Sequence, residues 1–243
     1  MEQQHKRSYC VDAAWTGRAD CSHCTIRHLM LFSDLPDSAF DHHLSPIDNF
    51  IFPAGSALFT EGQDDGAVFS IRRGLVKLLS LTPDGDQRIV RLLGAGATIG
   101  LEILEADTSY RHTAVTLNQV NACRIPASTM NSLRAEYPRL CQHTLKMLQN
   151  HLDRADQWIV TLGTGPARKR VARLLLLMLQ NSTEPAGGIE LLGRGDMAAI
   201  IGASVETASR IVADMKRRHL LEKVSGSLYR CDAAGLQAIT DED

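Results

Sequence analysis

The sequence predicts an α+β protein: a domain of short β-strands, then one long helix, then a small helical domain ending in a β-hairpin. Three patterns support this fold class. Along residues 47–126, apolar and polar residues alternate in short runs. From 145 to 162, apolar residues recur at heptad spacing. Within 192–212, two short helical runs of apolar residues flank a tight turn. A chain of 243 residues is long enough for two domains.

The first 30 residues are polar and contain Cys10, Cys21 and Cys24, without a convincing regular element. Residues 31–45 are expected to form a short helical entry to the first domain. The N-terminus has no signal-peptide core, and no apolar run approaches the roughly 18 residues of a membrane span. We therefore expect a cytoplasmic protein with no membrane partner, in which the six cysteines are reduced thiols or metal ligands.

Short strands are predicted throughout residues 47–126, within a first domain that spans 31–129. Apolar runs are separated by glycine-containing turn signals, which is typical of a small β-sandwich or roll. The hairpin tip at residues 82–87, TPDGDQ, is one such turn.

A long helix is predicted over residues 130–162, with Pro138 near its start. Its apolar residues step by three and four positions, as in a coiled-coil seam. The seam residues are Leu145, Leu148, Leu152, Ala155, Ile159 and Leu162. This stripe could pack on the β-domain, but its narrowness and polar flanks favour a parallel homodimer. A glycine-containing hinge, residues 163–166, follows the helix.

The segment 192–212 predicts a helix-turn-helix. Asp196 can cap the first helix, Gly202 suits the left-handed position of the turn, and Ser204 can cap the second helix. The second helix has an apolar face that begins at Val205. Another face carries the side chains Glu206, Ser209 and Arg210, and such a polar face can contact bases in the major groove of DNA.

Basic residues follow the second helix, and residues 223–230 predict a hairpin that turns at Ser225-Gly226, as in a winged helix. Residues 163–230 contain 11 basic and 6 acidic residues, a charge of +5, whereas the remainder carries 15 and 22, a charge of −7. A basic module on an acidic body favours double-stranded DNA as the partner of residues 163–243. An ordinary helical hairpin is the alternative, and no catalytic triad, carboxylate pair or phosphate loop indicates an enzyme.

Over residues 30–235 the chain resembles the Crp–Fnr superfamily of bacterial transcription regulators. Its most specific match is RGDMAAIIGASVETASR, residues 194–210, and the VETASR part resembles the Fnr branch. The resemblance implies a double-stranded β-roll of the cyclic-nucleotide-binding type and palindromic TTGAT-like half-sites. Glu206 and Arg210 would contact the G·C pair, and Ser209 would face thymine. The expected DNA-contacting residues are Ser204, Glu206, Thr207, Ser209, Arg210 and Lys216.

In the Fnr-like sensors, N-terminal cysteines and one roll cysteine bind a [4Fe–4S] cluster. Cys21 and Cys24 match the N-terminal pair, and Cys123 matches the distant ligand. The family has a further N-terminal cysteine ligand at a position that is occupied by Met30 in this chain. Cys10 is therefore expected to replace it as the fourth ligand. The chain would then offer four thiolates to a cluster that senses redox state, O₂ or NO. In this family, residues 82–87 also fall where activators touch RNA polymerase, although a plain hairpin tip explains them equally well.

Other chemistries remain open for the cysteines and for the roll. Cys10, Cys21 and Cys24 with His23 or His28 could bind zinc, and Cys21 with Cys24 could act by thiol redox chemistry. A c-type haem is disfavoured because Thr25 follows Cys24. A thiol oxidoreductase is disfavoured because no βαβ pattern surrounds the pair. Cys141 and Cys231 are most simply structural.

A cyclic nucleotide is the alternative effector in the roll. Glu102 and Arg111 each miss the family's ligand-binding position by one residue. One position in a strand moves a side chain to the opposite face. We therefore expect both side chains to point out of the nucleotide pocket.

Overall fold

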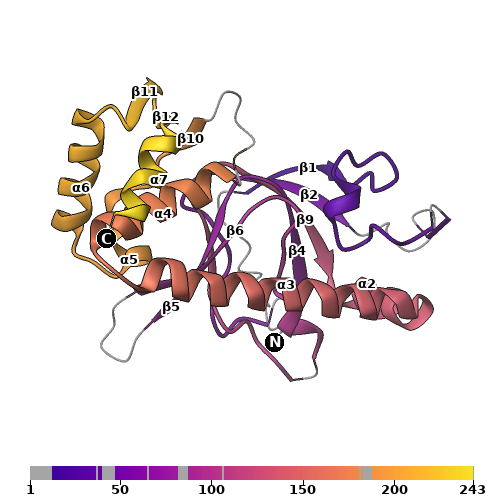
Figure 1. The fold of residues 1–243 in the computed structure, drawn as a ribbon. Coiled ribbons are helices and arrows are strands. Elements are labelled where there is room, and N and C mark those ends of the chain that lie inside the picture. The colour runs from indigo at the N-terminus through magenta and orange to yellow at the C-terminus, as the bar shows by residue number, and fades with distance from the viewer. Residues whose placement is uncertain are drawn as a thin grey trace, which may run out of the picture. The chain divides into compact units, whose positions relative to one another are not determined.

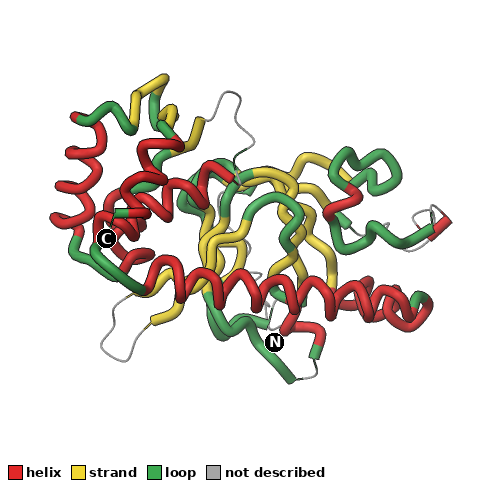
Figure 2. Tube along the Cα trace, viewed as in Figure 1, coloured by secondary structure: helices red, strands yellow, loops and turns green. Residues whose placement is uncertain are grey.

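The computed structural model describes residues 13–36, 38–39, 47–64, 66–81, 87–105, 107–180, 182 and 188–242. It divides into two compact units, one from residues 1–80 and 91–149, the other from 81–90 and 150–243. Strands dominate the first unit and helices the second (Figures 1 and 2). Cys10 and residues 82–86 lie outside the described residues. No helix in the described part is long and apolar enough to cross a membrane.

The first unit contains the predicted β-domain, built from antiparallel strands in two sheets. The five-stranded sheet has the order β1-β2-β9-β4-β7, and the four-stranded sheet has the order β3-β8-β5-β6. The first comprises β1 (Ala14–Arg18), β2 (Asp48–Phe52), β9 (Val120–Pro126), β4 (Ala67–Arg73) and β7 (Thr98–Ile99). The second comprises β3 (Ala57–Phe59), β8 (Thr113–Thr116), β5 (Val76–Leu81) and β6 (Gln87–Leu93). A short 3-10 helix, η2 (Leu101–Leu104), follows β7.

The N-terminal segment contains regular structure that the sequence did not predict. Strand β1 pairs antiparallel with β2, and the 3-10 helix η1 (Arg27–Leu29) follows the two cysteines of the loop. Because β1 is an exposed edge strand, it lacks the buried apolar alternation that marks a strand in a sequence. The helical entry expected over 31–45 is mostly absent from the described residues: 31–35 form turns, and 38–39 are helical.

A buried cluster joins the segment after η1 to the first sheet and to the helices that follow it. Leu31 and Phe32 pack in this cluster with Cys123 and Ile125 of β9. Residues of β9 alternate between the two faces of the sheet, so Cys123 and Ile125 share one face. Met130, Leu133, Leu140 and Met147 from the following helices complete the packing. The chain around the N-terminal cysteines is thereby fixed against Cys123.

The long helix expected over 130–162 is two helices. Helix α2 (Ala127–Glu136) ends before Pro138, and α3 (Pro138–Gly163) begins at that proline. Proline has no backbone N–H and disfavours the helical conformation of the preceding residue, here Tyr137, whose ψ is 85°. Pro138 therefore starts a new helix instead of lying inside one.

The second unit is the predicted helix-turn-helix followed by a hairpin. Helices α5 (Arg194–Ile201) and α6 (Val205–Arg217) are followed by β11 (Leu221–Ser225) and β12 (Leu228–Cys231). These two strands form a three-stranded sheet with β10 (Gly188–Glu190), in the order β10-β12-β11. Helices α4 (Ala167–Gln180) and α7 (Ala233–Asp241) also belong to this unit, together with the second half of α3 and the first residues of β6. The predicted α+β fold is confirmed in both units.

Candidate DNA-binding surface and cysteine cavity

The turn between α5 and α6 has the geometry that its sequence predicts. Gly202 ends α5 in the left-handed conformation, with φ 61° and ψ 50°, which glycine adopts without steric cost. The hydroxyl of Ser204 accepts a hydrogen bond from the backbone N–H of Thr207 at 3.2 Å and caps α6. Asp196 is not the cap of α5. The helix starts at Arg194, so Asp196 lies in the first turn, where its charge still suits the helix dipole.

Helix α6 has one buried and one exposed face. Ala208, Val212 and Met215 are completely buried, whereas Glu206 and Arg210 are exposed. Val205 was expected on the apolar face but is 48% exposed. It is the first residue of the helix, and the buried face of α6 begins one turn later, at Ala208. The polar face therefore begins at the first turn of the helix.

The charges on this face are arranged in adjacent turns. The backbone N–H of Glu206, the nearby Ser204 side chain and the charge of Arg210, one turn further along, all act on the Glu206 carboxylate. These contacts, the backbone hydrogen bond above all, lower the pKa of Glu206 below its ordinary value. A carboxylate acceptor and a guanidinium donor are thus presented side by side at neutral pH.

Lys216 has an intramolecular partner. Its Nζ donates a hydrogen bond to the Tyr229 hydroxyl at 2.6 Å and lies 4.2 Å from the centre of the ring. This hydrogen bond is the main reason why the pKa of Tyr229 is lowered. Lys216 thereby connects the end of α6 to strand β12 of the wing. The sequence predicted that Lys216 contacts DNA, but it gave no indication of the hydrogen bond to Tyr229.

We expect Lys216→Ala and Tyr229→Phe both to weaken DNA binding, with non-additive effects, because each removes the hydrogen bond between α6 and the wing. The dependence of log K on log salt should stay unchanged in both variants. Fluorescence anisotropy titrations at several salt concentrations measure both quantities. A slope reduced by about 0.9 in Lys216→Ala alone would show instead that Lys216 neutralises a phosphate.

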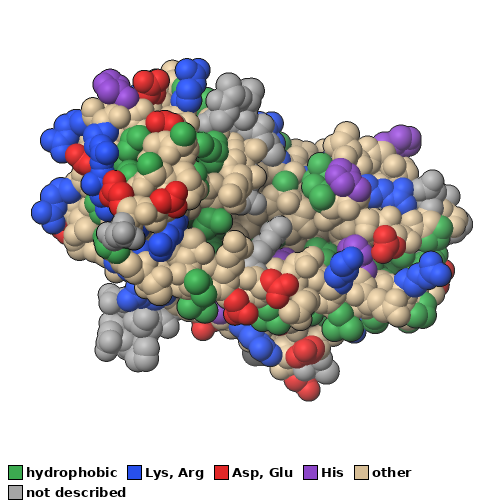
Figure 3. All heavy atoms as spheres, viewed as in Figure 1, with side chains coloured by type: hydrophobic (Ala, Val, Ile, Leu, Met, Phe, Trp, Pro, Cys, Tyr) green, Lys and Arg blue, Asp and Glu red, His purple; other side chains and the backbone are tan. Residues whose placement is uncertain are grey.

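Basic side chains surround the exposed face of α6. Figure 3 shows Lys and Arg side chains gathered over this helix, and Lys216 and Arg217 lie in its last turn. Arg217 is paired with Asp214 at 3.2 Å, an exposed pair that contributes little to stability. The unit combines an exposed polar helix face with nearby positive charge, an arrangement that is typical of a winged-helix DNA-binding domain.

The predicted seam of α3 is exposed in the single chain. Leu145, Leu152 and Ile159 are 66%, 52% and 70% exposed, and Leu148 is 39% exposed. By contrast, Leu140, Met147 and His151 on another side of the helix are buried. Leu162, the last residue of the expected stripe, is 1% exposed and belongs to the buried side. The stripe is therefore not used for packing within the chain.

Three cysteines from distant parts of the sequence line one cavity in the first unit. Cys21 and Cys24 lie in the loop after β1, and Cys123 projects from the central strand β9. The cavity has a volume of about 30 Å³, and Met30, Arg27 and Arg72 also line it. The residue at the family's cysteine position, Met30, is thus beside the three thiols and only 7% exposed.

Cys21 and Cys123 are held in the protonated form. Burial, with a smaller contribution from the neighbouring thiols, raises the pKa of Cys123 to about 12 and that of Cys21 to about 11. Arg72 lowers both pKa values, and Arg27 lowers that of Cys21. Cys123 donates a weak hydrogen bond to the Asn49 side chain at 3.4 Å. The two guanidinium groups supply positive charge that would offset thiolates formed on metal binding.

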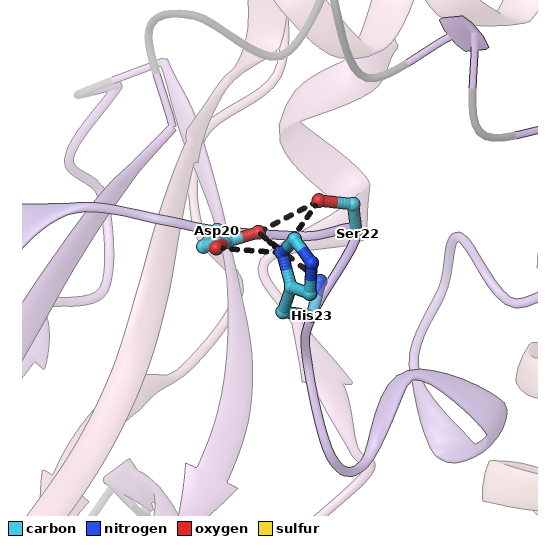
Figure 4. A network of polar contacts seen from close by, with 3 residues as sticks. All are labelled: Asp20, Ser22 and His23. Carbon is cyan, nitrogen blue, oxygen red and sulfur yellow. Dashed lines mark hydrogen bonds and ion pairs between the residues drawn. The ribbon is translucent and has the colours of Figure 1, made fainter.

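A compact polar turn fixes the loop that carries Cys21 and Cys24 (Figure 4). The Asp20 carboxylate accepts hydrogen bonds from the Ser22 hydroxyl at 2.8 Å and from the backbone N–H of His23 at 3.1 Å. The imidazole Nδ1 of His23 lies 3.0 Å from the same carboxylate. The backbone hydrogen bond, more than the others, lowers the pKa of Asp20. Neither His23 nor His28 is among the described residues that line the cavity, which disfavours the zinc alternative.

The donor set of the cavity fits an iron–sulfur cluster, and its present volume does not. Among the described residues, no group of three or more His, Cys, Asp or Glu side chains is arranged for metal binding. The cavity, at about 30 Å³, has room for little more than water, so a cluster needs more space than the cavity offers in this structure. Thiols are nevertheless the ligands that such clusters require.

The roll residues that resemble a nucleotide-binding pair do not lie in strands, contrary to the expectation from the sequence: Glu102 is in η2, and Arg111 precedes β8. The side chain of Arg111 is 70% exposed, and its guanidinium lies 4.0 Å from the exposed Glu105 carboxylate. The carboxylate of Glu102 accepts a hydrogen bond from the backbone N–H of Arg111. This arrangement agrees with the expectation that Arg111 points out of the roll.

Together, a β-roll unit and a winged helix-turn-helix define a DNA-binding regulator rather than an enzyme. Comparisons with known proteins agree: residues 50–137 match the cyclic nucleotide-binding domain family, and residues 169–239 match the Crp-like helix-turn-helix domain family. The chain belongs to the Crp–Fnr family of transcription regulators.

A curated relative supports the same family, and solved structures support the same fold. The chain is 25% identical over 210 residues to the fumarate and nitrate reduction regulatory protein of Yersinia pestis, covering 83% of this chain and 82% of the relative. FixK2 from Bradyrhizobium japonicum has a similar fold, with a TM-score of 0.69, 19% identity, and coverage of 81% and 98%. A CRP-family transcriptional regulator from Thermus thermophilus gives a TM-score of 0.68, 22% identity, and coverage of 79% and 96%.

Proposed function

We propose that this protein is a dimeric transcription regulator of the Fnr type, in which an iron–sulfur cluster held by N-terminal cysteines and Cys123 controls DNA binding. The observation that carries the proposal is the cavity where Cys21, Cys24 and Cys123 meet. Two cysteines of one loop and a third some 100 positions further along the chain line this one cavity. The relatives named as fumarate and nitrate reduction regulatory proteins give independent support for the Fnr type.

DNA recognition is assigned to the exposed face of α6. The Glu206 carboxylate can accept from the cytosine amino group, and Arg210 can donate two hydrogen bonds to guanine, so together they can recognise one G·C pair. Ser209, on the same face, would contact the adjacent thymine. These contacts support a TTGAT-like half-site for each protomer.

Glu206→Ala is expected to reduce discrimination at the G·C position by about 1–3 kcal/mol, because the cytosine amino group loses its acceptor. Affinity for DNA that lacks a specific site should change little. Competition binding with half-sites substituted at each base pair measures the loss. Asp214→Ala, on the same helix but paired with Arg217, is the matched control. Undiminished preference for G·C in Glu206→Ala would contradict the assigned role.

The exposed stripe of α3 is proposed as the dimer interface. Leu145, Leu148, Leu152, Ala155 and Ile159 follow a heptad pattern, and the four larger side chains are exposed in the single chain. Pairing these stripes in parallel buries them and relates the two α6 helices by a two-fold axis. A palindromic site with half-sites roughly 34 Å apart is the expected target.

Cys21, Cys24 and Cys123 would hold the cluster, with Cys10 as the fourth ligand in place of Met30. When bound, a [4Fe–4S] cluster supplies reactivity towards O₂ and NO. The protein contributes a fixed distance between the N-terminal loop and β9, because all three cysteines must stay at one site. Strand β9 ends at Pro126 and α2 begins at Ala127, so the tether at Cys123 is directly connected to the helices that precede the dimer stripe.

Release of this tether would change the equilibrium between monomer and dimer, and with it DNA affinity, since only a dimer contacts both half-sites. The N-terminal loop is then the sensing element and α3 the responding element. Anaerobic footprinting of cluster-containing and cluster-free protein tests this regulation.

A further inference from the structure

A second, polar cleft lies between the N-terminal segment and the start of α3, and the proposed DNA and cysteine sites do not use it. Its volume is about 560 Å³, and it is open to solvent: five of its seven lining residues are exposed, and Ser33 and His143 are half-buried. Residues His28, Ser33 and Asp34 line one side, and four side chains of α3 line the other. These four are Arg139, Gln142, His143 and Lys146.

The helical residues of the cleft share one face of α3. They follow the spacing i, i+3, i+4 and i+7, so their side chains converge on the same side of the helix. The stripe from Leu145 to Ile159 lies on a different side. Pairing of two chains through that stripe therefore leaves the cleft open to solvent.

The cleft has an excess of positive charge. Asp34 is the one carboxylate among its described lining residues, and it lies 3.2 Å from Nδ1 of His143. Arg139 and Lys146 consequently have no carboxylate left to neutralise them within the lining. Arg139 lies in the first turn of α3, where the helix dipole adds to the positive potential. Gln142 supplies a neutral hydrogen-bond donor beside them, whereas the Ser33 hydroxyl donates to Asp34.

We infer that this cleft binds a small phosphorylated molecule. The guanidinium of Arg139 can bind phosphate oxygens through two parallel hydrogen bonds, and the Lys146 ammonium can act as a second point charge further along the same face. An apolar ligand does not suit a lining of seven polar residues, and a cation is repelled by the two uncompensated charges. Because the ligand would contact both the segment after Cys24 and α3, it would connect the sensing segment to the dimer helix.

Inorganic pyrophosphate is the probe for this inference. Calorimetric titration of the full-length protein at constant ionic strength should give saturable binding with one site per chain. The double variant Arg139→Gln/Lys146→Gln should bind at least tenfold more weakly. Arg139→Lys/Lys146→Arg keeps the charges and should retain most of the affinity. Arg134→Gln on α2, outside the cleft, is the matched control and should bind as the unmodified chain does.

Two results would overturn the inference. One is pyrophosphate binding that is absent, or that is equal in the unmodified chain and the double glutamine variant. The other is equal affinity for sulfate and pyrophosphate, since this would indicate general charge attraction instead of a phosphate site. The cysteine cavity and α6 are unchanged in these variants, so neither result depends on whether the protein binds a cluster. Unfolding temperatures show whether the exposed substitutions leave the fold intact.

Discussion

Leu152→Glu is expected to convert the protein into a folded monomer with little affinity for a palindromic site. Leu152 lies in the middle of the stripe on α3 and is 52% exposed in the single chain, so a carboxylate there does not disturb the chain's own core. In a parallel dimer the same substitution places two carboxylates opposite each other at an apolar seam. Losing the second half-site should weaken DNA binding by about 10²–10⁴-fold.

Sedimentation equilibrium and anisotropy titration of the same samples measure both effects of Leu152→Glu. Val160→Glu is the matched control, since Val160 is exposed to 68% on the same helix but is not part of the stripe. It should remain dimeric and bind DNA normally. If Leu152→Glu stays dimeric, the dimer uses another surface, and the assignment of the stripe is wrong.

Exchanging the fourth ligand should have an all-or-none effect on the iron content. The anaerobically purified chain is expected to contain about four irons, and Cys10→Ala should lose them, because three thiols remain for four iron atoms. In Cys10→Ala/Met30→Cys the iron should return, since Met30 already lines the cavity with the three thiols. Iron and sulfide analysis with visible spectra measures the outcome.

Cys231→Ala is the control for these variants, because Cys231 lies on β12 in the other unit. Its iron content should equal that of the unmodified chain. Full iron content in Cys10→Ala would exclude Cys10 as a ligand. Full iron content in Cys123→Ala would go further and contradict the proposed site itself.

Local patterns in the sequence were sufficient to predict the helix-turn-helix. The αL position of Gly202 and the cap at Ser204 depend on neighbouring residues, so a short segment determines them. Asp196 was expected about one turn too early, as the cap, and Val205 was expected to be buried, because helix ends depend on packing that a sequence does not display. Strand β1 was missed for a related reason, since an exposed edge strand needs only backbone pairing with β2.

Contacts between residues that are far apart in the sequence could not be predicted from local patterns. The family resemblance brought Cys123 together with Cys21 and Cys24, but only the fold places Met30 beside them. Nothing in the sequence links Lys216 to Tyr229, because their contact depends on how the wing folds back towards α6. The cleft at Arg139 and Lys146 also depends on a tertiary contact, the packing of residues 30–35 near the start of α3.

The central claim is that the cysteine site controls DNA binding, and paired affinity measurements test it most directly. The same anaerobic preparation, before and after removal of iron, is titrated against one palindromic TTGAT-containing duplex at fixed salt. The account predicts that the iron-containing protein is dimeric and binds much more tightly than the iron-free protein. Equal affinity of the two forms would contradict control by the cysteine site, even if the protein contained the expected iron.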